Sequence, residues 1–252
     1  MKNVTFLAAV VVALGVTAAH ANSVNTVTAR FDSIINREAV HVKNGSEDLY
    51  VWSGLSKFEK LSIDPDETTN PAYYLDTVFS GYCIDLKEEI SWDFEGTWQL
   101  APLEEAPIGA GQPAMGTGRA DLLRNLWGSY FNDPHNAEFQ VAVWELLAET
   151  SGDYDVTNEN GAFYVKTADD DEVDVSMINT WLDVVTDENY SGQVASVVWA
   201  MVSDGTQDFA VLIETGGAPP VIPEPVTMLG LLAGIGGLIH YARKRGGRAP
   251  VR

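Results

Sequence analysis

The sequence predicts an α+β domain: an antiparallel β-sheet or sandwich with a helical subdomain inserted into it. Three observations support this fold class. Segments near both ends of the domain alternate apolar with polar side chains or are rich in β-branched and aromatic residues, as strands are. Between about residues 117 and 190 the apolar spacing is instead that of helices. The turn dipeptides Asn44-Gly45 and Asp204-Gly205 separate strand segments at the two ends.

The predicted strands surround the helical segment in the sequence. Residues 24–42 are expected to form a strand pair or a strand with a turn. Residues 78–86 are expected to form a strand in which Tyr82 shares the main apolar face and Cys83 lies on the other face. Cys83 is therefore expected to face a second layer, such as a helix. The remaining predicted strands are 49–52, 91–99, 194–202 and 208–213.

Three helices are expected within the insertion. They cover residues 119–131, 139–150 and a segment that begins near Ser176, which we expect to cap it. The short connector between the first two predicts a helical hairpin. Asn136 or Asp133 is the expected N-cap of the second helix.

The second helix carries an amide where an apolar side chain is expected. At about 100° per residue, Glu138, Glu145 and Glu149 fall on one stripe. Gln140 falls almost opposite them, on the apolar face that includes Trp144. A buried amide without partners costs about 1–3 kcal/mol. We therefore expect another group to bond to Gln140 or to react with it.

Both ends of the chain carry targeting signals. An apolar run from Val4 to Val16 and the triplet Ala19-His20-Ala21 predict a secretory signal peptide over residues 1–21. Residues 217–252 contain a Pro/Gly-rich linker, an apolar segment 226–242 and the basic run 243–245. That order predicts a C-terminal transmembrane helix with the domain, residues 22–216, outside the cytoplasm.

The C-terminal end also resembles a known sorting signal. Pro223-Glu224-Pro225, an apolar Gly-rich helix and a basic end occur in the order found in PEP-CTERM proteins. The resemblance implies processing by a membrane-embedded exosortase in a Gram-negative bacterium that makes exopolysaccharide. It implies transient anchoring in the inner membrane, followed by release to the cell surface or extracellular matrix.

Composition excludes some chemistries and leaves others open. A formal net charge of −21 argues against nucleic acid as a partner. Two of the four histidines lie in the terminal signals, which argues against a His-rich metal site, and no cofactor is expected. We interpret the acidic stretches 64–71 and 169–171 as solvated loops. A lone cysteine in an oxidising compartment is inert, intermolecularly paired, modified or reactive.

One reaction accounts for both the lone Cys83 and the misplaced Gln140. If the thiolate attacks the side-chain amide, ammonia leaves and an internal thioester forms. Backbone donors can then hold the carbonyl oxygen. Surrounding aromatic side chains would keep water away until an amine or hydroxyl nucleophile arrives.

The two segments resemble the signature motifs of bacterial surface thioester domains. These segments are Tyr82-Cys83-Ile84-Asp85 and Phe139-Gln140-Val141-Ala142-Val143-Trp144-Glu145. The resemblance implies that Cys83 and Gln140 form the thioester, with Tyr82 and Trp144 as their motif neighbours. It spans most of residues 75–213. Gln193 begins a partial echo of the second motif in a β-branched context, and Gln140 is preferred over it.

Three functional hypotheses follow. The first is an exported protein whose Cys83–Gln140 thioester captures a surface or matrix ligand once, and which is therefore not an enzyme. The second is a non-reactive structural or binding component of the exopolysaccharide matrix. The third is a Cys–His hydrolase that uses His41 or His135.

Overall fold

The computed structural model describes residues 24–213, except residues 110, 160, 167–172 and 196. The predicted signal peptide, the 226–242 segment and the sorting motif Pro223, Glu224 and Pro225 lie outside the described residues. No helix within the described part of the chain is long and apolar enough to cross a membrane.

The fold is α+β, as predicted, and its antiparallel sheet closes into a barrel. The sheet order is β2-β3-β7-β6-β4-β1-β5, and β2 also pairs with β1, so six strands form a ring and β5 lies outside it. Closure gives the six strands two neighbours each and removes the exposed edges that an open sheet would have. The strands are β1 Thr26–Asn44, β2 Glu47–Asp64, β3 Val78–Cys83, β4 Glu95–Pro102, β5 Phe163–Val165, β6 Val198–Val202 and β7 Phe209–Leu212.

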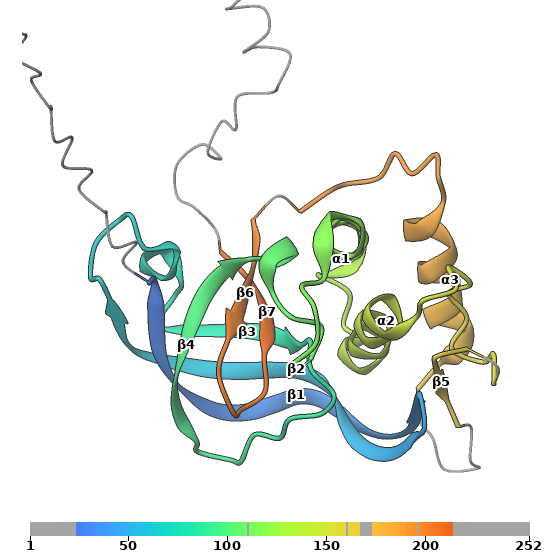
Figure 1. Ribbon diagram of the computed structural model, residues 1–252, viewed down its shortest axis with the longest axis horizontal. Helices are drawn as coiled ribbons and strands as arrows, with labels where there is room; N and C mark the ends of the chain where they lie inside the picture. The colour runs from blue at the N-terminus through green and yellow to red at the C-terminus, as the bar shows by residue number, and fades with distance from the viewer. Residues whose placement is uncertain (1–23, 110, 160, 167–172, 196, 214–252) are drawn as a thin grey trace, which may run out of the picture.

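A long hairpin, β1 and β2, forms the base of the molecule (Figure 1). The predicted Asn44-Gly45 turn joins the strands, and Gly45 adopts a φ of +58° that favours glycine. The expectation of a strand pair within 24–42 is wrong, because β1 is one strand. Its register shifts three times against β2. These bulges interrupt the alternation of apolar and polar side chains along β1. For that reason the sequence pattern of one long strand resembles that of two short ones.

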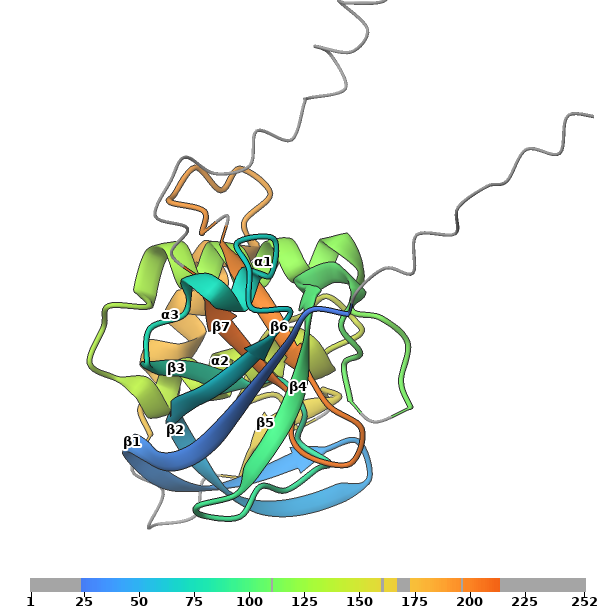
Figure 2. The ribbon, with the colours of Figure 1, turned by 90° about the vertical axis from the view of Figure 1, so that its left-hand side faces the viewer.

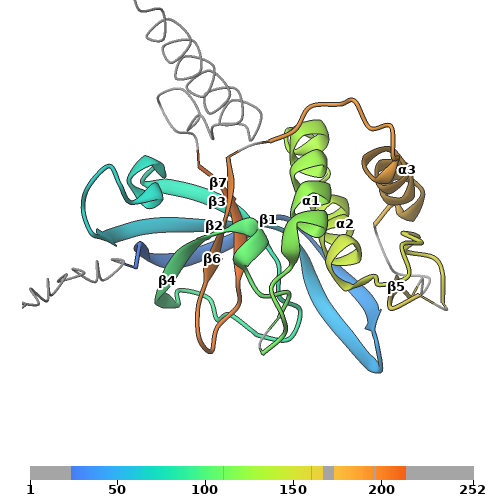
Figure 3. The same cartoon turned by 45° about the horizontal axis from the view of Figure 1, so that its top comes forward.

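In the described part of the chain, three α-helices lie between β4 and β6 and gather on one side of the barrel (Figures 1 and 3). They are α1 Gly116–Tyr130, α2 Asn136–Ala148 and α3 Val175–Thr186. Figure 2 is turned by 90° and views the barrel from the side that lies away from the helices, with β1, β2 and β4 in front of them.

The predicted helix caps are wrong. His135 occupies the N-cap position of α2 without a side-chain hydrogen bond, and Asn136 is the first helical residue. Asp174 rather than Ser176 caps α3, because its carboxylate accepts the backbone N–H of Ser176 and of Met177.

Two aromatic clusters hold the layers together. Inside the barrel, Phe58 has four aromatic neighbours at centroid distances of 4.8–5.9 Å: Phe31, Phe79, Trp98 and Phe209. Between barrel and helices, Tyr82 stacks on Phe139 at 4.3 Å and meets Trp127 edge-on at 5.5 Å. Tyr82 thus attaches β3 to both α1 and α2.

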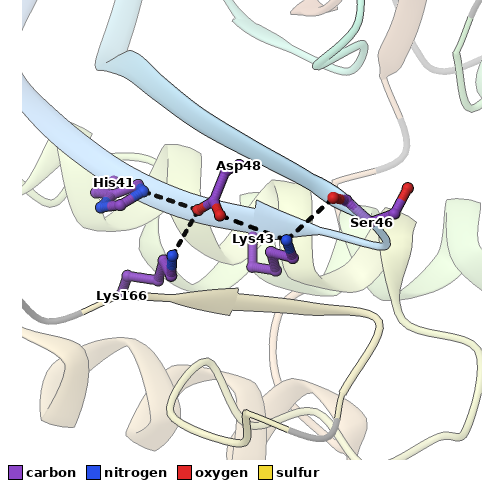
Figure 4. Close-up of polar contacts among 5 residues, drawn as sticks. All are labelled: His41, Lys43, Ser46, Asp48 and Lys166. Carbon is purple, nitrogen blue, oxygen red and sulfur yellow. Dashed lines mark hydrogen bonds and ion pairs between the residues drawn. The ribbon is translucent and has the colours of Figure 1, made fainter.

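A group of ion pairs ties β5 to the hairpin end (Figure 4). Asp48 accepts hydrogen bonds from Lys166 at 2.7 Å and Lys43 at 3.4 Å, and its carboxylate lies 2.9 Å from the ring of His41. The bond from Lys166 is the main reason why the pKa of Asp48 falls to about 2. The group is half exposed, so we assign it a role in holding β5 in place rather than a large share of stability.

Because α1 lies close to the segment before β6, we expect alanine substitutions at two glycines of this helix to change the stability of the fold in opposite directions. A Cβ on Gly128 would lie 2.0 Å from the carbonyl oxygen of Gln193, whereas one on Gly118 would meet nothing within 4 Å. We expect Gly128→Ala to destabilise the fold by about 2 kcal/mol or more. Gly118→Ala, the matched control, should stabilise it by roughly 0.5–1 kcal/mol. Urea unfolding measures both, and equal effects would contradict the predicted close approach.

Candidate functional site

The structure brings Cys83 and Gln140 together. The side-chain oxygen of Gln140 accepts the backbone N–H of Cys83 at 2.8 Å, and its amide nitrogen donates to the backbone carbonyl of Cys83 at 2.8 Å. Both residues are buried, with exposures of 4% for Cys83 and 1% for Gln140. The side-chain amide of Gln140 thus bonds to both backbone groups of Cys83, as the backbone of a neighbouring strand would do. It does so at the last residue of β3.

The backbone of β3 is positioned by its neighbours on both sides. Cys83 is opposite Phe209 of β7. Two residues earlier, a Cβ on Gly81 would lie 2.7 Å from the carbonyl oxygen of Ala210, so this pairing requires glycine. The hydroxyl of Tyr82 donates to the side chain of Asn136 at 2.9 Å, which fixes the start of α2 against β3. Gln140 follows one turn later on that helix.

The thiol of Cys83 is shielded and protonated. It donates to the carbonyl oxygen of Asp85 at 2.9 Å. Burial raises its pKa to about 12, and the charges of Asp85 and Asp208 act in the same direction. The indole N–H of Trp144 has no hydrogen-bond partner among the described residues, yet it is near enough to the sulfur to favour the thiolate. A thiol of this kind does not react readily with reagents from solution.

Two buried carboxyl groups accompany the thiol. Asp85 is 1% exposed and accepts the backbone N–H of Lys87. Asp208 is 2% exposed, accepts the backbone N–H of Ser203 at 2.8 Å, and its backbone carbonyl accepts the N–H of Ile84. Burial raises the pKa of Asp208 to about 7. Asp208 can therefore exchange a proton near neutral pH beside the segment that carries Cys83.

Trp144 lines two cavities and is also near the sulfur of Cys83. It lines a cavity of about 450 Å³ together with residues of the β1–β2 hairpin and of the loop that follows β3. It also lines a smaller cavity of about 220 Å³, whose wall includes Ile84 and Asp85, the residues that follow Cys83. Trp144 is itself only 3% exposed. Cys83 itself lines neither cavity, so the thiol is not reached from them unless side chains such as Trp144 move.

The glutamate stripe of α2 is buried rather than exposed to solvent. Glu149 accepts the backbone N–H groups of Thr150, Ser151 and Ala162, and Glu138 accepts that of Asp174. Glu145 is fully buried, and neither of its carboxylate oxygens makes a hydrogen bond of ordinary geometry among the described residues, although the backbone of Asp155 is near enough to offset in part the rise in its pKa that burial causes. Helical spacing in the sequence predicts that these glutamates share one face of α2. It does not predict that the loop after α2 and the start of α3 cover that face.

The other residues considered in the sequence lie away from this pair. The His135 ring contacts Asp133, and the His41 ring bonds to Asp48 and stacks on Tyr50, so neither histidine hydrogen-bonds to Cys83. Gln193 is exposed and lies outside any helix or strand. Within the described ranges, no group of three or more His, Cys, Asp and Glu side chains is arranged to hold a metal ion.

Comparisons with protein-family models, with curated proteins and with solved structures find no match to this chain. The arguments for its function therefore rest on the geometry of its own residues.

The buried Glu145 predicts a loss of stability as pH rises. Burial, followed by the charge of Glu149, raises the pKa of Glu145 from its ordinary 4.5 to about 8. The folded state therefore binds a proton that the unfolded state releases between these two pH values. Stability falls across this window, by an amount on the order of a few kcal/mol in total. Glu145→Gln, which mimics the protonated form, should remove this loss, so that the variant is more stable than wild type at pH 9 and nearly equal to it at pH 4.

Glu149→Gln provides the contrasting variant. Burial raises the pKa of Glu149, but its three backbone donors outweigh burial and leave the pKa below the ordinary value. Its stabilising contribution is present above pH 4.5 and is lost as pH falls further. Glu149→Gln should therefore destabilise the fold at neutral pH. Urea unfolding at several pH values tests both, and a Glu145→Gln variant that loses stability at pH 9 would contradict the assignment.

Proposed function

We propose that Cys83 and Gln140 form an internal thioester with which this exported protein captures a nucleophile-bearing ligand covalently. The observation that carries the proposal is the pair of 2.8 Å hydrogen bonds that hold the carboxamide of Gln140 against the backbone of Cys83. The nucleophile and its electrophile are buried together on β3 and α2, 57 residues apart in the chain. Holding two reacting groups in place removes the entropic cost of bringing them together.

The proposed reaction has two steps. In the first, the thiol of Cys83 gives up its proton, its sulfur bonds to the side-chain carbonyl carbon of Gln140, and the carbon–nitrogen bond breaks. The leaving nitrogen takes the proton and departs as ammonia. In the second, an amine or hydroxyl of the ligand attacks the same carbon, the carbon–sulfur bond breaks, and the thiol is restored. The protein ends joined to the ligand through an amide or ester.

Two features of the site support the first step. The backbone N–H of Cys83 already donates to the side-chain oxygen of Gln140, so it can stabilise negative charge that develops there. Asp208, whose pKa burial raises to about 7 and whose charge acts on the thiol, is our candidate for the group that accepts the thiol proton. Trp144 and the aromatic layer around Tyr82 would then shield the thioester from water.

A second candidate function is a non-reactive structural or binding component of the extracellular matrix. The same two hydrogen bonds favour it as well, because they give both the oxygen and the nitrogen of the Gln140 amide a partner without any reaction. In that case Gln140 only fastens α2 to the barrel. The acidic charge and the exported setting expected from the sequence suit either candidate.

Intact mass distinguishes the two candidates. If the thioester forms, the protein purified without added amines should weigh less than its sequence by one ammonia. Methylamine should then add once, at Gln140. Gln140→Ala should show the full mass and no adduct, while the control Gln193→Ala, at an exposed position, should behave as wild type. Full mass in the wild type, with Cys83 freely alkylated after unfolding, would exclude the thioester and leave the non-reactive function.

A further inference from the structure

The larger of the two cavities described above lies between the β1–β2 hairpin, the loop that follows β3 and Trp144 of α2, and it is not used by the proposed reaction. It has a volume of about 450 Å³, the size of pockets that hold small organic ligands. Its lining combines aromatic side chains with charged and amide groups. The aromatic members are Phe31, Tyr50, Trp52, Trp92 and Trp144, and the polar ones include Glu47, Lys87, Glu88, Glu89 and Gln207.

Three of these aromatic side chains are unusually exposed. Tyr50 is 81% exposed, Trp52 is 52% exposed and Trp92 is 49% exposed. Large aromatic side chains that gather on a surface usually mark a binding site.

These rings are held in place without a ligand. The ring of Tyr50 stacks on His41 at 4.0 Å, which leaves its other face toward solvent. The guanidinium of Arg37 lies 4.7 Å from the ring centroid of Trp52 and 5.5 Å from that of Trp92, so it links the two indoles. A preformed platform loses little conformational entropy when it binds.

The polar side chains that line the cavity indicate which hydrogen-bonding groups a ligand must carry. Glu47, Glu88 and Glu89 offer hydrogen-bond acceptors, while Lys87 and Gln207 offer donors. A ligand that matches this lining has flat apolar faces edged by groups that both donate and accept. Pyranose rings have this form, with C–H groups on their faces and hydroxyls around their edges. The chain's net charge of −21 disfavours an anionic polymer.

We propose that this aromatic cavity binds a neutral oligosaccharide segment of a larger glycan. Sugar rings pack on Tyr50 and Trp52, and their hydroxyls bond to the carboxylates and to Lys87. The inference deepens the proposed function, on which its covalent part rests. Trp144 lines the cavity and is near the sulfur of Cys83, so in the covalent part of the proposal a hydroxyl of the bound glycan reaches the thioester when Trp144 moves aside. Attack by that hydroxyl would form an ester to residue 140 and restore the thiol.

Binding is tested first without the covalent reaction. The full-length chain carrying Cys83→Ala is titrated by calorimetry with neutral hexasaccharides: β-1,4-linked glucose, β-1,4-linked mannose and α-1,4-linked glucose. Oligogalacturonate and oligolysine are the charged comparison probes. We expect at least one neutral probe to bind. Tyr50→Ala and Trp52→Ala should each weaken that binding about tenfold, the effect of losing a contact worth about 1.4 kcal/mol.

Two further variants keep the test decisive. Trp52→Phe retains an aromatic ring and should retain most of the binding even if Trp52→Ala folds poorly. Tyr73→Ala removes a 46% exposed aromatic side chain that does not line the cavity, and it should leave binding unchanged. Failure of every neutral probe, binding of oligolysine alone, or binding that survives the Tyr50→Ala, Trp52→Ala double variant would overturn the inference.

The covalent reaction separates this inference from the proposed function. If the chain with Cys83 reacts with methylamine while the Cys83→Ala chain binds no glycan, the thioester stands and the glycan cavity fails. If the glycan binds but the chain with Cys83 has its full mass, the cavity is correct and the thioester fails. A glycan adduct that hydroxylamine cleaves, absent in Gln140→Ala, supports both.

Discussion

The arrangement of the molecule depends on the two hydrogen bonds between the side chain of Gln140 and the backbone of Cys83. They occupy the backbone N–H and C=O of the last residue of β3 with an amide from α2. A helix that packed against this strand end with an apolar side chain would leave two buried backbone groups unpaired. Each would cost about 1–3 kcal/mol. The amide therefore sets both the height and the rotation of α2 against the barrel.

Fixing α2 in this way places it between two layers and buries both of its faces. Its apolar face meets the barrel, while its glutamates meet the loop after α2 and the start of α3. Glu149 and Glu138 are satisfied by backbone N–H groups from those segments. Glu145 is not, and the energy of an unpaired buried carboxylate is lowered by binding a proton. The position of one helix thus determines the ionisation of a residue that does not contact Cys83.

Local patterns in the sequence predicted the turns, the three helices and the mixed fold class, because these depend on neighbouring residues. The turn at Gly45 and the helical face of α2 are examples. Closure of the barrel could not be predicted, because β1 must pair on one side with β2, its neighbour in the chain, and on the other side with β4. β4 follows much later in the chain, and no local pattern indicates that pairing. The bulges in β1 concealed its length because they interrupt the alternation of apolar and polar side chains. Within the site, the misplaced amide indicated Gln140, but nothing local indicated that Glu145 would be enclosed.

The raised pKa of Cys83 limits the chemistry that the site can perform. At a pKa of about 12 only a very small fraction of the thiol is ionised near neutral pH, so attack on a substrate that diffuses in would be slow. An amide held permanently beside Cys83 does not face that limit, because high effective concentration offsets a low thiolate fraction. The reaction also needs to occur only once in each molecule. Burial therefore argues against a turning-over cysteine hydrolase while remaining compatible with a single internal acyl transfer.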